Sequence, residues 1–117
     1  MTQYQVTNGS IVSAEGAWAM TKGFGFNMSF TVNFERATAD YNSARGAEGL
    51  KLFEEGREPR IIAPPGGDGY IGELTHFVDS IQHNRAPTIV TAQDGLRSVE
   101  ICEAEERSIR TGQVVIL

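Results

Sequence analysis

The chain has 117 residues, of which 40% are apolar, and this is enough for one folded domain with its own core. Its formal net charge of −5 argues against nucleic acid or an anionic membrane as a partner, because both need clustered Lys and Arg. Cys102 is the only cysteine, so no internal disulfide can form. The first residues do not resemble a signal peptide, and no apolar run approaches the roughly 20 residues of a membrane span, so we expect a cytoplasmic protein.

The first half of the chain predicts strands. Residues 26–35 are the clearest case, because apolar and polar side chains alternate along "FNMSFTVNFE". Met28, Phe30, Val32 and Phe34 fall on one face, while the other face is rich in Ser, Thr and Asn. We take this strand as the centre of a sheet. The other predicted strands are 11–20, which Gly16 weakens, and 37–44, 49–55 and 59–63, joined by the short connections of antiparallel hairpins.

The second half of the chain predicts two helices. Over residues 68–84 the apolar side chains recur every three or four positions, and Asp68 is the expected N-cap. A second helix begins near Thr91, where Thr91 and Asp94 approximate a capping box, and Gly112 stands where a C-terminal glycine belongs. Residues 113–117 predict a last strand. The order predicts an α+β fold: an open, mostly antiparallel sheet with helices packed on one face, ending in a short C-terminal strand.

The run from Gly67 to Gly72 matches the G-x-G-x-x-G pattern of dinucleotide-binding loops. Its context does not fit, because such a loop joins a buried strand directly to a helix. Here the preceding apolar run is only Ile61–Ala63, two prolines intervene, and Asp68 would place a carboxylate beside the phosphates. We therefore predict the start of a helix, with an independent nucleotide binder as the weaker alternative.

A longer pattern extends from Tyr70 to the end of the chain. Its elements are Tyr70, Glu73, Leu74, Phe77 and Ile81, then Pro87, then Thr91, Asp94, Gly95, Ala104, Ser108, Thr111 and Gly112. This pattern resembles the C-terminal end of the Gfo/Idh/MocA oxidoreductases. The earlier stretch around Trp18 and residues 26–41 is similar to the sheet strands of that family, so the resemblance covers nearly all of 1–117 as a single domain.

The resemblance implies the substrate-binding and dimerisation domain of an NAD(P)-dependent oxidoreductase that acts on a sugar-like or polyol substrate. The family's glycine-rich nucleotide-binding loop and its Glu-Lys-Pro motif are not among these residues. Asp79 and His83 match the letters of its Asp-x-x-x-His motif but lie on a different helix. We therefore expect a chain that is not active alone and holds no catalytic, cofactor-binding or metal-binding residue, with NAD(P) implied only for the intact enzyme.

Five residues are candidates for substrate contact. The resemblance implies that Tyr70 and Glu73, on the first turn of the helix, face the substrate cleft. Trp18, Lys22 and Phe24 flank a glycine-containing loop, and an aromatic side chain beside a cation on such a loop could cover a sugar-like ligand.

The remaining expectations concern partners and single side chains. A helical layer covers one sheet face, so the Ser/Thr/Asn-rich face is solvated or paired, and in the resembling family it forms dimers. We expect homo-oligomers through this open face. His76 reads as a polar-face residue and Cys102 as a core thiol. The alternative function is a non-enzymatic, self-associating ligand-binding or scaffold module.

Overall fold

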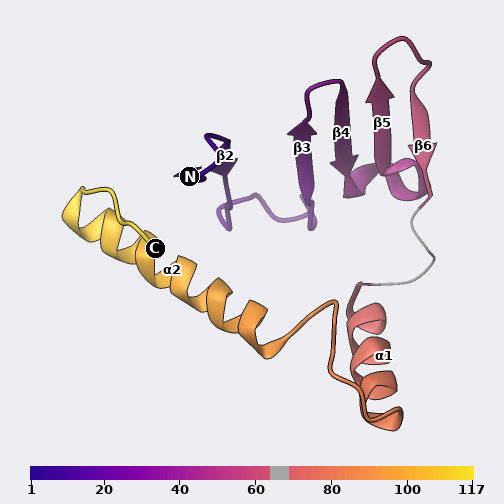
Figure 1. Ribbon diagram of the computed structural model, residues 1–117. Coiled ribbons are helices and arrows are strands. Elements are labelled where there is room, and N and C mark those ends of the chain that lie inside the picture. Colours follow the sequence, from indigo (N-terminus) through magenta and orange to yellow (C-terminus); the bar gives the residue numbers. More distant parts are fainter. Residues whose placement is uncertain (64–68) are drawn as a thin grey trace. The chain divides into compact units, whose positions relative to one another are not determined.

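The computed structural model describes residues 1–63 and 69–117 (Figure 1). These residues form two compact units. The sheet unit lies within Trp18–Gly67, and the hairpin–helix unit combines Met1–Ala17 with Asp68–Leu117. Antiparallel strands in two open sheets and two main helices confirm the α+β class. That the 117 residues act as a single domain stays a prediction.

The sheet unit is a four-stranded antiparallel meander in the order β3-β4-β5-β6. Its strands are β3 (Ser29–Asn33), β4 (Ala37–Asn42), β5 (Leu50–Glu54) and β6 (Arg60–Ile62). A short turn joins β3 to β4, and the Phe34 N–H donates to the Ala37 carbonyl at 2.8 Å. A 3₁₀ segment, η1 (Ser43–Glu48), joins β4 to β5 and is interrupted at Gly46, whose φ is +57°.

Register places the apolar residues of β3 and their partners in β4 and β5 on one face of the sheet unit. Phe30 lies opposite Tyr41, and their rings stack with centroids 5.2 Å apart. The pairing then continues from Val32 to Ala39 and Leu52, so side chains of one kind share a face across neighbouring strands. The opposite face is polar along β3 and β4, where it carries Thr31, Asn33, Thr38 and Asp40, and it also carries Lys51, Phe53 and Ile61 on β5 and β6. The two-faced pattern predicted for residues 26–35 is therefore present.

The position of this strand in the sheet differs from the prediction. Among the described residues β3 pairs only with β4, so the strand expected at the centre is an edge strand. Alternation along a strand specifies its two faces but not the number of its neighbours, which explains the error.

The N-terminal hairpin pairs β1 (Thr2–Gln5) with β2 (Ile11–Ala14). Its turn uses Gly9 at φ +89°, and the Gly9 N–H donates to the Val6 carbonyl at 2.8 Å. The strand predicted over 11–20 was too long, because it ends at Ala14, which lies opposite Thr2, the first residue of its four-residue partner β1. Sequence analysis did not single out β1 as a strand.

The helices are α1 (Gly69–Gln82) and α2 (Ala92–Thr111). The capping box is confirmed: the Asp94 N–H donates to the Thr91 hydroxyl at 3.1 Å, and the Thr91 N–H donates to the Asp94 carboxylate at 2.8 Å. Gly112 ends α2 in the left-handed conformation at φ +66°, as predicted. The N-cap expected at Asp68 lies outside the described residues.

The C-terminal strand predicted over 113–117 is wrong. These residues follow Gly112 without forming a strand, and the Gln113 carbonyl accepts a hydrogen bond from the Ser108 hydroxyl at 2.7 Å. β-branched residues favour a strand, but a strand also needs a neighbour to pair with. The predicted packing of both helices on one sheet face stays a prediction, because the four-stranded sheet and the helices belong to different units.

Candidate functional site

The loop that carries Trp18, Lys22 and Phe24 belongs to the sheet unit. The Phe24 N–H donates to the Thr21 carbonyl at 3.0 Å, and Gly23 has a φ of +94°. This is a β-turn with a positive φ at its third residue, which glycine tolerates best. The turn places Lys22 at its tip, and Trp18 is fully exposed at 101%.

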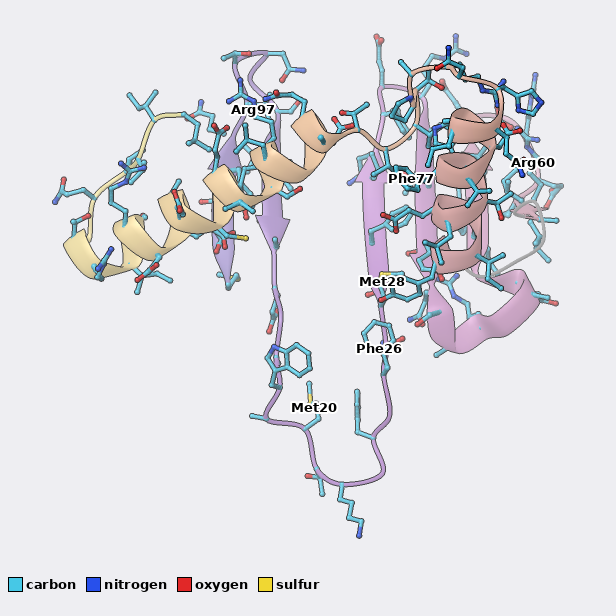
Figure 2. The ribbon with its side chains drawn as sticks, turned by 90° about the horizontal axis from the view of Figure 1, so that it is seen from below. Met20, Phe26, Met28, Arg60, Phe77 and Arg97 are labelled. Atoms are coloured by element: carbon cyan, nitrogen blue, oxygen red, sulfur yellow. The ribbon has the colours of Figure 1, made fainter. Side chains whose placement is uncertain are left out.

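Apolar side chains continue from this turn toward β3. Phe24, Phe26 and Met28 are exposed, and Figure 2 shows Phe26 and Met28 in succession on the approach to the strand. A run of exposed large apolar side chains near one cation can contact a ligand with both apolar and polar edges. The loop residues predicted as a group are therefore near one another in the chain and exposed together.

Tyr70 and Glu73 lie on the first turn of α1, in the hairpin–helix unit, and both are exposed. The five predicted residues are thus divided between the two units, three in one and two in the other. Their assignment to substrate contact stays a prediction.

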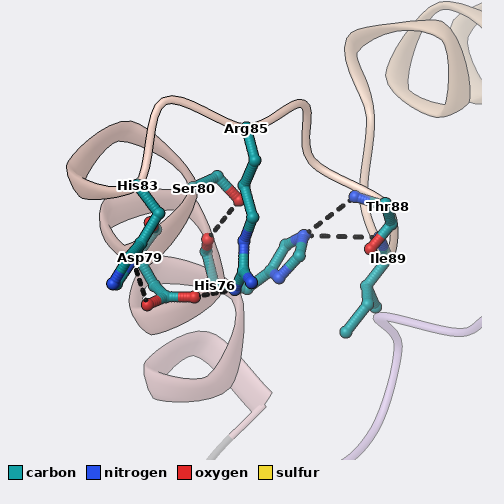
Figure 3. A network of polar contacts seen from close by, with 7 residues as sticks. All are labelled: His76, Asp79, Ser80, His83, Arg85, Thr88 and Ile89. Atoms are coloured by element: carbon teal, nitrogen blue, oxygen red, sulfur yellow. Dashed lines mark hydrogen bonds and ion pairs between the residues drawn. The ribbon is translucent and has the colours of Figure 1, made fainter.

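His76, which sequence analysis treated as a polar-face residue, has a specific structural role. Its Nε2 accepts a hydrogen bond from the Thr88 N–H at 3.1 Å, and the Ile89 N–H lies at 3.3 Å (Figure 3). A ring nitrogen that accepts cannot carry a proton, so this geometry requires the neutral tautomer protonated at Nδ1. His76 therefore ties the chain after α1 back to the helix, and no sequence pattern of ours pointed to this.

A second polar cluster closes the end of α1. The Asp79 carboxylate contacts His83 Nδ1 at 2.9 Å and forms an ion pair with Arg85 (Figure 3). Ser80, which is buried, donates its hydroxyl to the His76 carbonyl at 2.7 Å, and the Arg85 N–H donates to the Ser80 carbonyl at 2.9 Å. The last two contacts involve backbone groups at the helix terminus and the first two are side-chain ion pairs, so the cluster has a structural explanation.

The hairpin–helix unit contains a groove of about 620 Å³ between β1, α2 and the C-terminal residues. Tyr4 donates its hydroxyl to the Glu105 carboxylate across it, and this hydrogen bond, aided by burial, raises the pKa of Tyr4 above its ordinary value. Ile101 and Val114–Leu117 add apolar side chains to the lining, and Gln5 and Ser108 add polar ones. A mixed lining of this kind can hold a small organic ligand.

The polar face of the sheet unit has its own network. Arg45 donates to the Asp40 carboxylate at 2.6 Å, and the Thr31 hydroxyl donates to it at 3.0 Å. The hydrogen bond from Arg45 has the larger effect and that from Thr31 the smaller one, and both lower the pKa of Asp40 below its ordinary value. The polar face therefore carries a largely self-satisfied set of side chains rather than an isolated reactive group.

The glycine run does not fit a dinucleotide loop where the structure describes it. Gly69 and Gly72 lie inside α1, and the strand that precedes them, β6, is an edge strand of an antiparallel sheet. A Cβ at either glycine would meet nothing within 4 Å, so no close backbone approach requires them. Gly67 and Asp68 lie outside the described residues.

The described residues contain no candidate metal cluster and no helix suited to cross a membrane. No group of three or more His, Cys, Asp or Glu side chains in this part of the chain could hold a metal ion. Neither α1 nor α2 combines the length and the apolar character that a membrane crossing requires. Cys102, expected in the core, is exposed on α2.

Comparison of the chain with protein-family models, with curated proteins and with solved structures finds no match.

Proposed function

We propose that residues 1–117 are the substrate-binding and oligomerisation domain of a cytoplasmic NAD(P)-dependent oxidoreductase for a sugar-like or polyol substrate. The observation that carries the proposal is the resemblance of residues 70–112 to the C-terminal end of the Gfo/Idh/MocA oxidoreductases. The α+β architecture and the extents of α1 and α2 support it. In the intact enzyme, hydride would pass between the nicotinamide and a hydroxyl-bearing carbon, with both the cofactor site and the proton-transferring lysine outside these residues.

Several residues of the motif in residues 70–112 have local structural roles. The motif is therefore stronger support for a fold than for a catalytic activity. Thr91 and Asp94 form the capping box of α2, and Gly112 is its left-handed C-cap. Ser108 accepts the Gly112 N–H through its carbonyl at 2.8 Å. These motif positions have local structural roles, so the proposal for substrate contact depends on other residues, in particular those of the Trp18–Phe24 loop.

Trp18 provides the test, because it is the only tryptophan and is fully exposed. Hexoses, hexitols and inositols would be titrated into the chain while its fluorescence is followed. We expect saturable quenching at millimolar ligand, as stacking of a sugar face on the indole would produce, and loss of that quenching in Lys22→Met. Lys51→Met is the matched control, since Lys51 lies on β5 and pairs with Glu48 at 3.9 Å. Quenching by no member of the panel, or equal affinity in Lys22→Met, would contradict the assignment of the loop.

A second candidate function is the non-enzymatic self-associating module. The specific observation in its favour is the apolar face of the sheet unit, where the β3 side chains of Phe30 and Val32 remain 48% and 41% exposed. Surfaces of this kind mark association sites. Self-association without binding of any sugar or polyol would favour this candidate over the first.

A further inference from the structure

Within the sheet unit, the outer edge of β3 has no neighbouring strand. Figure 1 shows β3 at one end of the row β3-β4-β5-β6. The other edge strand, β6, has only three residues, and Pro59 and Pro64 flank it in the sequence. Proline and short length are the usual means by which proteins prevent edge pairing, and β3 has neither.

The hydrogen-bonding pattern shows which backbone groups of β3 point outward. The Met28 carbonyl accepts from the Ser43 N–H at 2.9 Å, and the Phe34 N–H donates to the Ala37 carbonyl. Since bonding alternates along an antiparallel pair, Phe30 and Val32 also direct their backbone groups toward β4. The N–H and C=O groups of Ser29, Thr31 and Asn33 then point away from β4, and no other described residue of the sheet unit bonds to them.

The sequence of β3 is complementary to itself when reversed. With Thr31 opposite Thr31 of a second chain, Ser29 lies opposite Asn33 and Phe30 lies opposite Val32. Polar residues then lie opposite polar residues on one face of the joined sheet. On the other face an aromatic residue lies opposite a β-branched one, which is a favourable cross-strand pair. Beyond the strand, Met28 would meet Phe34.

Charge also permits this pairing. Ser29–Asn33 contains no charged residue, so two copies meet without like charges opposite each other, although each chain carries a net charge of −5. Thr31, Ser29 and Asn33 would exchange about six backbone hydrogen bonds with the second copy, two for each directly opposed pair.

We propose that β3 is a self-association edge, at which two copies of this chain pair antiparallel about Thr31 to form a continuous sheet through the isologous contact of a two-fold dimer. The strand is five residues long, so the interface falls below about 1,200 Å² in total and the dimer is weak and concentration-dependent. The proposal does not depend on oxidoreductase chemistry. It also concerns a surface other than the polar face through which the resemblance implies dimers.

Amide hydrogen exchange of the 117-residue chain at two concentrations tests the edge directly. At about 10 μM and about 1 mM, concentrations that bracket a weak dimer, the Phe30 and Val32 amides act as internal controls because they bond to β4. We expect the Thr31 and Asn33 amides to exchange about tenfold more slowly at the higher concentration, with the controls unchanged. Protection of Thr31 that is the same at both concentrations, or absent at both, would overturn the proposal.

Two variants separate the edge from the polar face in sedimentation experiments. Thr31→Pro removes an outward N–H and the side-chain bond to Asp40 while leaving the backbone bonds to β4, and it should abolish the dimer. Thr38→Lys places a charge on the polar face of β4 and should leave edge pairing intact. The opposite result, a dimer in Thr31→Pro and a monomer in Thr38→Lys, would overturn edge pairing and support association through the polar face. If circular dichroism shows that Thr31→Pro is unfolded, amide exchange in the unmodified chain decides.

Discussion

At the scale of single residues, His76 is the clearest case of a side chain whose role comes from geometry. Its Nε2 receives backbone N–H groups from Thr88 and Ile89, residues twelve and thirteen positions later in the chain. Replacement by phenylalanine keeps an aromatic ring but removes the acceptor, so the amides of Thr88 and Ile89 should exchange several-fold faster with solvent.

The matched control is His83→Phe, in the turn directly after α1. His83 contacts Asp79 rather than the loop, so the Thr88 and Ile89 amides should keep their rates in this variant. Nitrogen NMR should also show His76 Nε2 as the unprotonated nitrogen of the ring. Equal acceleration in both variants would mean that general loosening of α1, and not loss of the acceptor, releases the loop.

Asp94 couples the start of α2 to pH. Hydrogen bonds from the Thr91 hydroxyl and the Thr91 N–H lower the pKa of Asp94 in the folded chain. A lowered folded pKa contributes stability that is present above the unfolded value, about 3.9, and is lost as the pH falls through the folded value. Asp94→Asn should therefore be less stable than the unmodified chain at pH 7.

The difference in free energy of unfolding between the unmodified chain and Asp94→Asn should decrease as the pH falls below about 4. At that pH the Asp94 carboxylate of the unmodified chain becomes protonated and loses its charge. Urea unfolding followed by circular dichroism at several pH values would measure this difference. Asp79→Asn is the comparison variant, because the Asp79 carboxylate that it removes lies on α1 and not in the cap of α2. If this difference in free energy of unfolding stayed constant with pH, the contribution of Asp94 would come from the geometry of the capping box and not from the charge of its carboxylate.

At the scale of secondary-structure elements, replacing two glycines, one within α2 and one at its C-cap, should change the stability of the chain in opposite directions. Gly112 has a φ of +66° and Gly95 lies within the helix, and a Cβ at either position would meet nothing within 4 Å. Both substitutions by alanine are therefore free of clashes, and only backbone preference decides the outcome. Gly112→Ala should lower the free energy of unfolding by about 1 kcal/mol, whereas Gly95→Ala should raise it by about 0.5–1 kcal/mol.

Thermal or urea unfolding of the two variants measures both the expected decrease and the expected increase in the free energy of unfolding. If Gly112→Ala were neutral, the left-handed cap would not be occupied in solution. A destabilised Gly95→Ala would instead indicate that the surface of α2 near Gly95 is covered in the folded chain.

The extents of the elements show which local signals are reliable. Thr91, Asp94 and Gly112 specified α2 correctly, because capping uses side chains and backbone groups within four residues of each other. The 3₁₀ segment Ser43–Glu48 was not predicted, and its first two residues fell inside the strand predicted over 37–44. Asn42 starts it by accepting the Ala44 N–H at 2.9 Å, a local turn signal that competes with strand propensity.

At the scale of the whole molecule, the glycine run gives a direct prediction about cofactor binding. Gly69 and Gly72 lie in α1 rather than in a loop after a buried parallel strand. The 117-residue chain should therefore not bind NADH or NADPH saturably up to about millimolar cofactor, a level far weaker than a dedicated dinucleotide site. Quenching of Trp18 by each cofactor measures this.

Free tryptophan at matched absorbance serves as the control, because reduced nicotinamides absorb light near the emission of the indole. Saturable micromolar quenching beyond that control would restore the nucleotide-binding hypothesis for Gly67–Gly72. It would also count against the proposed function, which assigns the cofactor site to residues outside this chain.

The sequence by itself determined the α+β class, the two faces of residues 26–35 and both ends of α2, since each depends on periodicity or on contacts within a few residues. Only the tertiary structure decided that β3 is an edge strand, that residues 113–117 form no strand and that His76 accepts hydrogen bonds from the Thr88–Ile89 segment. These depend on which distant segments become neighbours. A strand and a hydrogen-bonded side chain both need a partner beside them, and the sequence pattern of one segment does not specify that partner.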